Sequence, residues 1–238
     1  MNNFSDAVKS IAGISLDPSQ VRAFDSYLEF LLEWNQRINL TAISDPEEIR
    51  IKHFLDSLSC LKAIPARCDI RLIDIGTGAG FPGIPLKIAV PEIRLTLVDA
   101  VGKKAEFCRL LVKRLQLSNV TVLHLRAEEA GCDPAHREQY DWAVARAVAR
   151  LPVLAEYLLP LVKAGGRALA QKGNTASEEA SAAAGAVQML GGKLEEIIPV
   201  ELPGIADKRF LIPMEKINPT PSKYPRRAGA PSKKPLSG

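Results

Sequence analysis

Five short apolar runs alternate with amphipathic segments after residue 70, and this alternation restricts the possible folds more than any other feature. The runs are Arg71–Ile75, Arg94–Val98, Val120–Leu125, Trp142–Ala145 and Arg167–Ala170. The segments with helical spacing are Pro82–Val90, Gly102–Leu117, Leu151–Val162 and Ser177–Leu190. Apolar strands separated by helices form a parallel sheet that is covered on both faces. The sequence therefore predicts an α/β fold with a mostly parallel sheet.

The residues before this pattern predict helices. Asp17-Pro18 and Asp45-Pro46 each supply an N-cap and a first-turn proline, and apolar residues follow at helical spacing. We expect a helical subdomain over residues 1–65 and an α/β domain over residues 66–215.

The end of the α/β domain predicts a change of strand direction. Lys193–Val200 and Lys208–Met214 have the pattern of strands, and the turn-rich residues 201–204 lie between them. We therefore expect the sheet to end in an antiparallel hairpin.

Composition places the chain among ordinary globular proteins. Of 238 residues, 47% are hydrophobic and 24% are charged, which argues against a disordered or fibrous chain. The first ten residues lack a secretory signal pattern, and Leu151–Val162 is too short to span a membrane. Four scattered cysteines without a CxxC pair argue against a zinc site or a disulfide framework. We expect a cytoplasmic protein with free thiols, no metal and no membrane partner.

Residues 216–238 form a basic, proline-rich segment. They include six Lys and Arg residues, no acidic residue, and five prolines between Pro219 and Pro235. Such a composition is expected to form no regular structure and predicts an extended strap or a mobile tail, part of which we expect to be ordered near the active cleft. The segment carries +6 and the whole chain +4, so the remaining 215 residues carry −2.

Glycines follow the first predicted strand of the sheet. Leu72–Gly83 runs from a strand through Gly76, Gly78 and Gly80 into a helix. Glycines allow the backbone to approach a ligand closely, and a helix N-terminus presents unpaired N–H groups. This order of strand, loop and helix predicts a nucleotide-type binding site.

Acidic residues at strand ends narrow the choice of ligand. Gly78, Gly80 and Gly83 satisfy the dinucleotide pattern GxGxxG, but Asp74 would repel a pyrophosphate and suits the cationic methionine end of S-adenosylmethionine. Asp99 ends the next strand, where it suits ribose hydroxyls of either ligand. Arg126-Ala127-Glu128 follows the third strand, where an adenine edge would be read.

Four motifs together resemble one known family. They are Asp74–Gly83, Trp34–Thr41, His53–Ser57 and Tyr224–Arg227, and the resemblance runs from about Ile11 to Leu236. They resemble the ribosomal RNA small subunit methyltransferase G family, also called glucose-inhibited division protein B. The resemblance implies a class I methyltransferase Rossmann-like fold and methylation of guanine N7 in 16S ribosomal RNA with S-adenosylmethionine. The glycine loop alone would indicate only a class I methyltransferase.

The resemblance also implies site residues. Cofactor contacts are expected at Gly76, Phe81, Ala127, Glu128 and Arg146; the glycine loop adds Gly78 and Gly80, and the strand-end argument adds Asp99. A structural ion pair is an equal alternative for Arg146. The expected substrate or RNA residues are Asn39, His53, Arg146, Tyr224, Arg226, Arg227, Lys233 and Lys234. Asp56 lies one helical turn from His53 and has no assigned role.

The implied reaction needs little from catalytic side chains. The N7 lone pair of guanine is free at neutral pH, so alignment for in-line displacement is sufficient and no essential acid or base is expected. N7 is inaccessible in the narrow A-form major groove, which favours an exposed guanine in ribosomal RNA or an assembly intermediate. We expect a monomer. The alternatives are a methyltransferase of small molecules or proteins, and a regulator that binds a nucleotide without catalysis.

Overall fold

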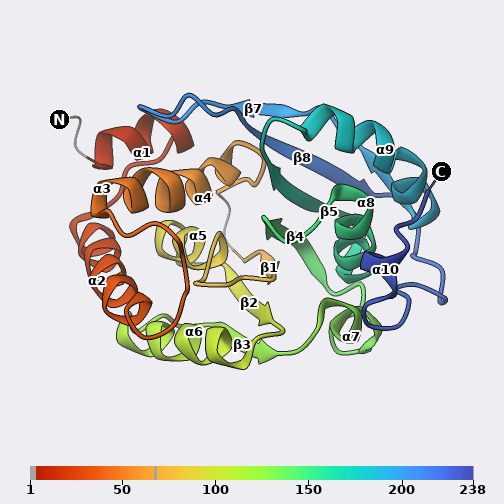
Figure 1. The fold of residues 1–238 in the computed structure, drawn as a ribbon, viewed down its shortest axis with the longest axis horizontal. Helices are drawn as coiled ribbons and strands as arrows, with labels where there is room; N and C mark the ends of the chain where they lie inside the picture. Colours follow the sequence, from red (N-terminus) through yellow and green to blue (C-terminus); the bar gives the residue numbers. More distant parts are fainter. Residues whose placement is uncertain (1–3, 67–68, 238) are drawn as a thin grey trace.

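A single mixed sheet forms the centre of the protein (Figure 1). The computed structural model describes residues 4–66 and 69–237. Within them the strand order is β3-β2-β1-β4-β5-β8-β6, and β7 also pairs with β8. The strands are β1 (Arg71–Ile75), β2 (Arg94–Asp99), β3 (Val120–His124), β4 (Tyr140–Arg146), β5 (Val162–Lys172), β6 (Gly192–Leu194), β7 (Ile198–Val200) and β8 (Arg209–Lys216). The five predicted strands are confirmed as a parallel set, and β8 runs antiparallel to β5.

Helices cover both faces of this sheet. One face packs against α5 (Gly83–Ala89) and α6 (Gly102–Arg114), and the other against α7 (Ala127–Cys132), α8 (Leu151–Leu158), the short helix η3 (Leu159–Leu161) and α9 (Ala176–Met189). Alternate residues of a strand therefore enter different cores: Leu72 lies in the first and Ile73 in the second. The predicted α/β fold is confirmed.

The N-terminal helices extend the first core. They are α1 (Phe4–Ala12), α2 (Pro18–Asn35), α3 (Pro46–Ile49), the π-helical turn η1 (Arg50–Leu55), α4 (Asp56–Leu58) and η2 (Ser59–Lys62). Asp17 and Asp45 cap α2 and α3 through their side chains, as the sequence predicts. Phe24 and Phe54 from these helices are fully buried in the same core as β1 and β2. The N-terminal helices therefore pack on the same side of the sheet as α5 and α6.

Two elements differ from the sequence prediction. The expected first hairpin strand is split into β6 and β7, which pair with different parts of β8. The helix α7 was not predicted, because its segment after β3 is only six residues long and has no marked hydrophobic spacing.

The basic segment after β8 is held against the body. It contains a four-residue helix, α10 (Ala230–Lys233), and Arg137 donates to the backbone oxygens of Thr220 and Tyr224 at 2.7 Å each. Lys216 is 1% exposed, and its Nζ lies 3.2 Å from Glu138 Oε1. Its charge is therefore paired inside the protein and is not presented to solvent. The expectation of no regular structure is wrong at α10, because these four residues form a short helix. We call residues 217–237 the strap.

Candidate functional site

The glycine loop leaves β1 at the centre of the sheet. Gly76 and Thr77 donate their N–H groups to the backbone oxygen of Val98 at 2.8 and 3.1 Å. Gly76 has a φ of +67°, and a Cβ built on it would lie 2.6 Å from the Val148 side chain. A residue other than glycine would be strained at this backbone angle and would displace the Val148 side chain.

The carboxylate of Asp74 lies beneath this loop. Oδ2 accepts hydrogen bonds from Thr77 Oγ1 at 2.7 Å and from Gly83 N at 2.9 Å. Gly83 has to be small, since a Cβ would lie 2.9 Å from that same oxygen. Oδ1 is buried and has no hydrogen-bond partner among the described residues. Burial raises the pKa of Asp74 to about 6, although both hydrogen bonds oppose the shift.

Asp99 ends β2 and ties the glycine loop to the next helix. It is 5% exposed, and its two oxygens accept from Gly78 N and Val101 N, each at 2.8 Å. Asp99 therefore holds Gly78 in place, a role that the sequence did not indicate.

Ala127 and Glu128 begin α7 at the third strand end. Glu128 is 5% exposed, and its Oε1 accepts from Gly229 N of the strap at 2.7 Å. The segment expected to read the adenine edge is therefore hydrogen-bonded to the strap. The sequence does not predict this contact, because the two residues are 101 positions apart.

Arg146, at the end of β4, joins the sheet to the N-terminal helices. Nη1 donates to Asp56 Oδ2 at 2.9 Å and to the Lys52 backbone oxygen at 3.1 Å, and Nη2 lies 3.2 Å from His53 Nδ1. The guanidinium also lies over the ring of Phe81, 4.8 Å from its centroid. The ion pair that the sequence left as an alternative is present, and it places Arg146 beside the glycine loop.

The protonation of His53 follows from these contacts. Arginine only donates, so Nδ1 accepts and the ring proton is on Nε2, which donates to Thr41 Oγ1 at 2.7 Å. The ring stacks on Phe81 with centroids 4.7 Å apart. Burial, reinforced by the charge of Arg146, lowers the pKa of His53 to about 3. His53 is therefore neutral throughout the physiological range.

A cavity of about 380 Å³ opens beside this cluster. The lining includes His53, Asp56, Arg146, Gln171 and Phe210. Sequence reasoning missed Gln171, although the signal was present: it is a polar residue at the end of a buried strand, as Asp74 and Asp99 are.

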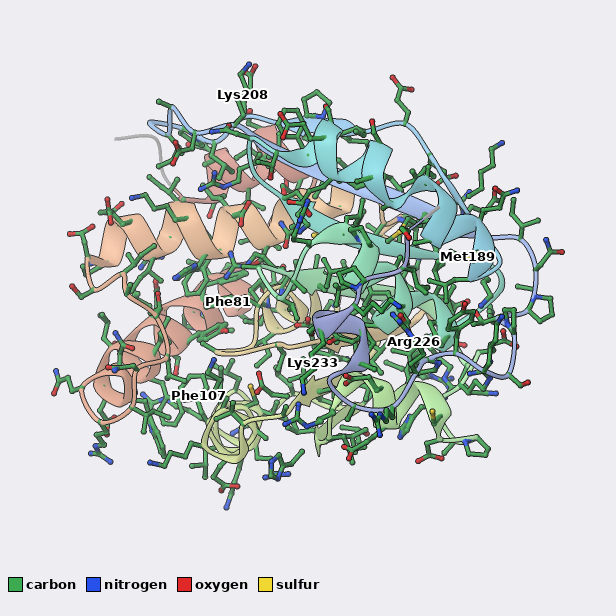
Figure 2. The ribbon with its side chains drawn as sticks, turned by 45° about the vertical axis from the view of Figure 1, so that its right-hand side comes forward. Phe81, Phe107, Met189, Lys208, Arg226 and Lys233 are labelled. Atoms are coloured by element: carbon green, nitrogen blue, oxygen red, sulfur yellow. The ribbon has the colours of Figure 1, made fainter. Side chains whose placement is uncertain are left out.

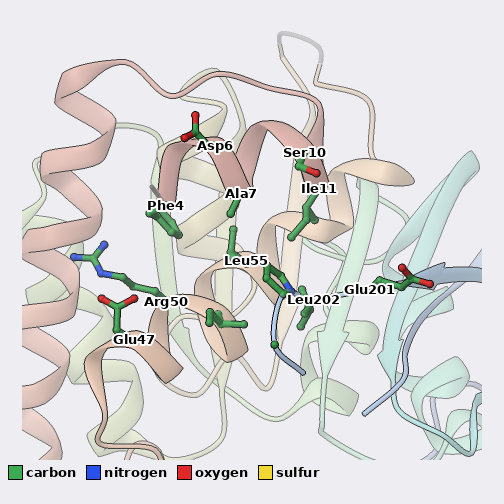
Figure 3. Close-up of a pocket in the computed structure, with 13 residues that line it drawn as sticks. Phe4, Asp6, Ala7, Ser10, Ile11, Glu47, Arg50, Leu55, Glu201 and Leu202 are labelled. Carbon is green, nitrogen blue, oxygen red and sulfur yellow. The ribbon is translucent and has the colours of Figure 1, made fainter. Parts of the chain in front are cut away.

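A second cavity lies away from the glycine loop. Its volume is about 710 Å³, and it is formed by α1, η1 and the loop between β7 and β8. Figure 3 shows Phe4, Arg50 and Leu202 around it. Arg50 is paired there with Asp25 at 2.6 Å. None of the expected site residues lines this cavity.

Two of the expected RNA residues in the strap have other roles. Tyr224 is 8% exposed and packs in the second core, so the expectation that it stacks on a base is wrong. Arg226 pairs with Glu156, which is completely buried, and Nε and Nη2 contact both carboxylate oxygens at 2.6–3.1 Å. That charge is neutralised inside the protein, which disagrees with a phosphate contact.

Four of the other expected RNA residues are exposed. Arg227, Lys233 and Lys234 are exposed on the strap, and Figure 2 shows Lys233 on α10 with Arg226 on the preceding segment. Asn39 is exposed in the turn after α2. That turn is stabilised by Asn35, whose Oδ1 accepts from Leu40 N and Thr41 N at 2.9 and 3.0 Å.

No helix in residues 4–66 and 69–237 combines the length and the apolar character needed to cross a membrane.

Known proteins resemble this chain along nearly its whole length. The family model described as rRNA small subunit methyltransferase G (GidB) matches residues 20–203. The ribosomal RNA small subunit methyltransferase G of Pelotomaculum thermopropionicum is 52% identical over 224 residues, covering 94% of each chain. The protein of that name from Desulforamulus reducens is 46% identical over 240 residues, covering 100% of each.

Solved structures support the fold. A SAM dependent methyltransferase from Aquifex aeolicus superposes with a TM-score of 0.55 at 16% identity, covering 73% of this chain and 94% of that one. At this identity the likeness shows a shared Rossmann-like methyltransferase fold.

Proposed function

This chain belongs to the rRNA small subunit methyltransferase G family, and we propose that it transfers a methyl group from S-adenosylmethionine to N7 of a guanine in 16S ribosomal RNA. The observation that carries the proposal is the match to relatives of that name over 94% of the chain or more. We further propose that it acts in the cytoplasm as a monomer.

The glycine loop fits this cofactor. Asp74 Oδ1 is a buried acceptor without a protein partner, which suits an ammonium donor of the cofactor. A Cβ built on Gly78 meets no atom closer than 3.9 Å, so this part of the loop is open to a ligand. Gly76, Gly78, Gly80 and Phe81 would then line the methionine part, Asp99 the ribose, and Ala127 and Glu128 the adenine.

S-adenosylmethionine supplies an electrophilic methyl group when it is bound. The side chains of this protein then have to hold guanine so that N7 faces that methyl group in line with the sulfur. A positively charged histidine would compete by donating to the N7 lone pair. His53 avoids this competition because its pKa of about 3 keeps the ring neutral.

Arg146 is the donor best placed to orient the base. It lies against Phe81 at the end of the glycine loop and against His53 from the N-terminal helices. A donor on guanine O6 would orient the base and leave N7 free. The ion pair with Asp56 holds the guanidinium in place for that contact.

The RNA contact is proposed to include the exposed cations of the strap. Arg227, Lys233 and Lys234 can neutralise phosphates without disturbing the interior. N7 is inaccessible in an A-form duplex, which favours a loop or an assembly intermediate as the substrate.

The deciding experiment incubates the protein with S-adenosylmethionine carrying a labelled methyl group and with small-subunit RNA that lacks the modification. We expect label in the RNA at N7 of a guanine. Cofactor binding with label in a small molecule or protein, or with no transfer, would favour one of the two alternatives given above and reject this function.

A further inference from the structure

The cavity beside Arg146 contains a buried acceptor that the protein leaves unsatisfied. Gln171 is 6% exposed and is the penultimate residue of β5. Nε2 donates to the backbone oxygen of Asp56 at 2.8 Å, which fixes which end of the amide is oxygen. Oε1 is buried and has no hydrogen-bond partner among the described residues. A buried carbonyl in this state points to a donor from a ligand.

Gln171 and Arg146 lie next to each other. They are register partners in the parallel β4–β5 pair, so their side chains leave the same face of the sheet. Three of the five N–H groups of Arg146 donate to Lys52, Asp56 and His53. Two donors remain without a partner in the described part of the chain. The cavity therefore presents free donors beside a free acceptor.

The rest of the cavity suits a planar base. Its volume of about 380 Å³ is in the range of small-ligand pockets, and Val200, Phe210 and Leu211 supply apolar wall. Arg146 and His53 line this cavity, and both pack on Phe81 of the glycine loop. A base in this cavity would thus lie next to the proposed cofactor site.

We propose that this cavity takes the extruded target guanine and that Gln171 Oε1 accepts a hydrogen bond from its N1–H while Arg146 donates to O6. The inference rests on the proposed function and adds to it the residue that selects the base. N7 lies on the far side of O6 from N1, so both contacts leave it free. Enzymes that modify a base commonly extrude it into such a pocket.

The pair of contacts selects guanine over adenine. With its rings in the same position, adenine would place its 6-amino group against the donors of Arg146 and its N1 lone pair against Gln171 Oε1. Both contacts would be repulsive and would leave buried groups unpaired, which is an effective basis for discrimination.

The test compares two RNAs that differ only in the substituent on N1 of the target guanosine. The position of this guanosine is first found by chemical cleavage at the N7-methylguanosine that the protein forms. 16S RNA is then prepared with either guanosine or 1-methylguanosine at that position. The wild-type protein should prefer guanosine by about 100-fold in kcat/KM, because the methyl group removes the donor and clashes with Gln171. Gln171→Ala should lower kcat/KM for the guanosine RNA about tenfold, because it removes the acceptor for N1–H. It should also reduce the preference for guanosine over 1-methylguanosine below about tenfold, because the smaller side chain makes room for the methyl group.

Gln188, which is exposed on α9, provides the matched control, and Gln188→Ala should keep the wild-type preference. An unchanged preference in Gln171→Ala overturns the assignment, even where overall activity is lower. If Gln171→Ala fails to fold by circular dichroism, Gln171→Asn, which withdraws the carbonyl by one methylene, makes the same comparison. A wild-type protein that binds S-adenosylmethionine but methylates neither RNA rejects the proposed function itself.

Discussion

Burial controls the charge of two residues beside the glycine loop, and it does so with opposite signs. Asp74 has its pKa raised to about 6, so it takes up a proton more readily than an ordinary aspartate. His53 has its pKa lowered to about 3, so it resists protonation. Each shift leads to a measurable pH dependence.

Asp74 should make cofactor binding depend on pH. If ionised Asp74 accepts a hydrogen bond from the cofactor ammonium, affinity rises as pH rises through about 6 and then levels. At pH 5 about one site in ten is ionised, so S-adenosylmethionine should bind roughly tenfold more weakly than at pH 7.5. Calorimetric titration at the two pH values measures this. The Asp74→Asn variant should bind S-adenosylmethionine weakly and with the same affinity at both pH values. Equal affinities of the wild-type protein at the two pH values would contradict the proposed role of Asp74.

His53 should make folding sensitive to acid. In the unfolded chain His53 protonates near its ordinary pKa of 6.5, whereas in the folded protein it protonates only near 3. The unfolded state therefore binds more protons in this window, and stability rises with pH between about 3 and 6.5. From pH 7.5 to 5 this group should cost about 2 kcal/mol.

Urea unfolding of wild type and His53→Gln at both pH values tests that prediction. Asp74 acts in the opposite direction: its raised pKa makes the folded state lose stability as pH rises from about 4 to 6. For this reason the difference between wild type and variant isolates His53. If the wild type and His53→Gln lost the same free energy of unfolding between pH 7.5 and pH 5, the His53 ring would not stay neutral in the folded protein.

Asp99 is expected to contribute to cofactor affinity both directly and through the loop. Asp99→Ala removes the proposed ribose contact and releases Gly78 N, and it should weaken S-adenosylmethionine binding by about 1–3 kcal/mol. Calorimetry measures the change, with the exposed Asp207→Ala as control. Binding within error of wild type would remove Asp99 from the site.

At the scale of elements, the strap is both structural and basic, and its charges divide accordingly. Within the strap, Arg226 is neutralised by Glu156, whereas Lys223, Arg227, Lys233 and Lys234 are exposed. Truncation after Asn218 would remove the structural Arg226 together with the four exposed cations. It would also remove the Gly229 contact to Glu128, so it cannot leave the cofactor site untouched.

Arg226 should stabilise the fold. Arg226→Met leaves the buried Glu156 carboxylate without its guanidinium partner and should destabilise the protein by about 3 kcal/mol in urea unfolding. The double variant with Glu156→Gln should recover part of this loss, because no buried charge remains. Additive losses would show that the two residues are not coupled.

The exposed cations of the strap should govern the salt dependence of RNA binding. Replacing Arg227, Lys233 and Lys234 by Gln should lower the slope of log affinity against log salt by about 2 while cofactor affinity is unchanged. The control replaces three exposed lysines elsewhere, namely Lys9, Lys62 and Lys113. Equal slopes in the two triple variants would exclude a special role of the strap.

At the scale of the whole molecule, the N-terminal helices and the sheet share one core. Phe54 of η1 packs at a tilt against Tyr27 and Phe81, so aromatic contacts run from α2 through η1 to the glycine loop. The described part of the predicted N-terminal subdomain, residues 4–65, has no separate apolar core, because its core continues into β1 and β2. We propose that this subdomain serves to place His53 and Asp56 over the end of β4.

This shared core should make unfolding cooperative. Thermal unfolding followed by near-UV and by far-UV circular dichroism should give coincident transitions, and Phe54→Ala should lower both midpoints together. An earlier loss of the N-terminal helices in the far-UV signal, with the tertiary signal of the sheet retained, would contradict the single core.

Local sequence patterns predict the parallel strands, the helix starts at Asp17 and Asp45, and the glycine loop, because each depends on residues that are close together in the chain. The same patterns predict the positions of Asp74 and Asp99, since carboxyl ends of parallel strands meet at one edge. Which charges are paired within the described residues depends on the folded chain. Glu156 lies 70 residues from Arg226, and Asp56 lies 90 residues from Arg146. A side chain's charge, protonation and access to ligand depend on such distant partners, which local spacing does not encode.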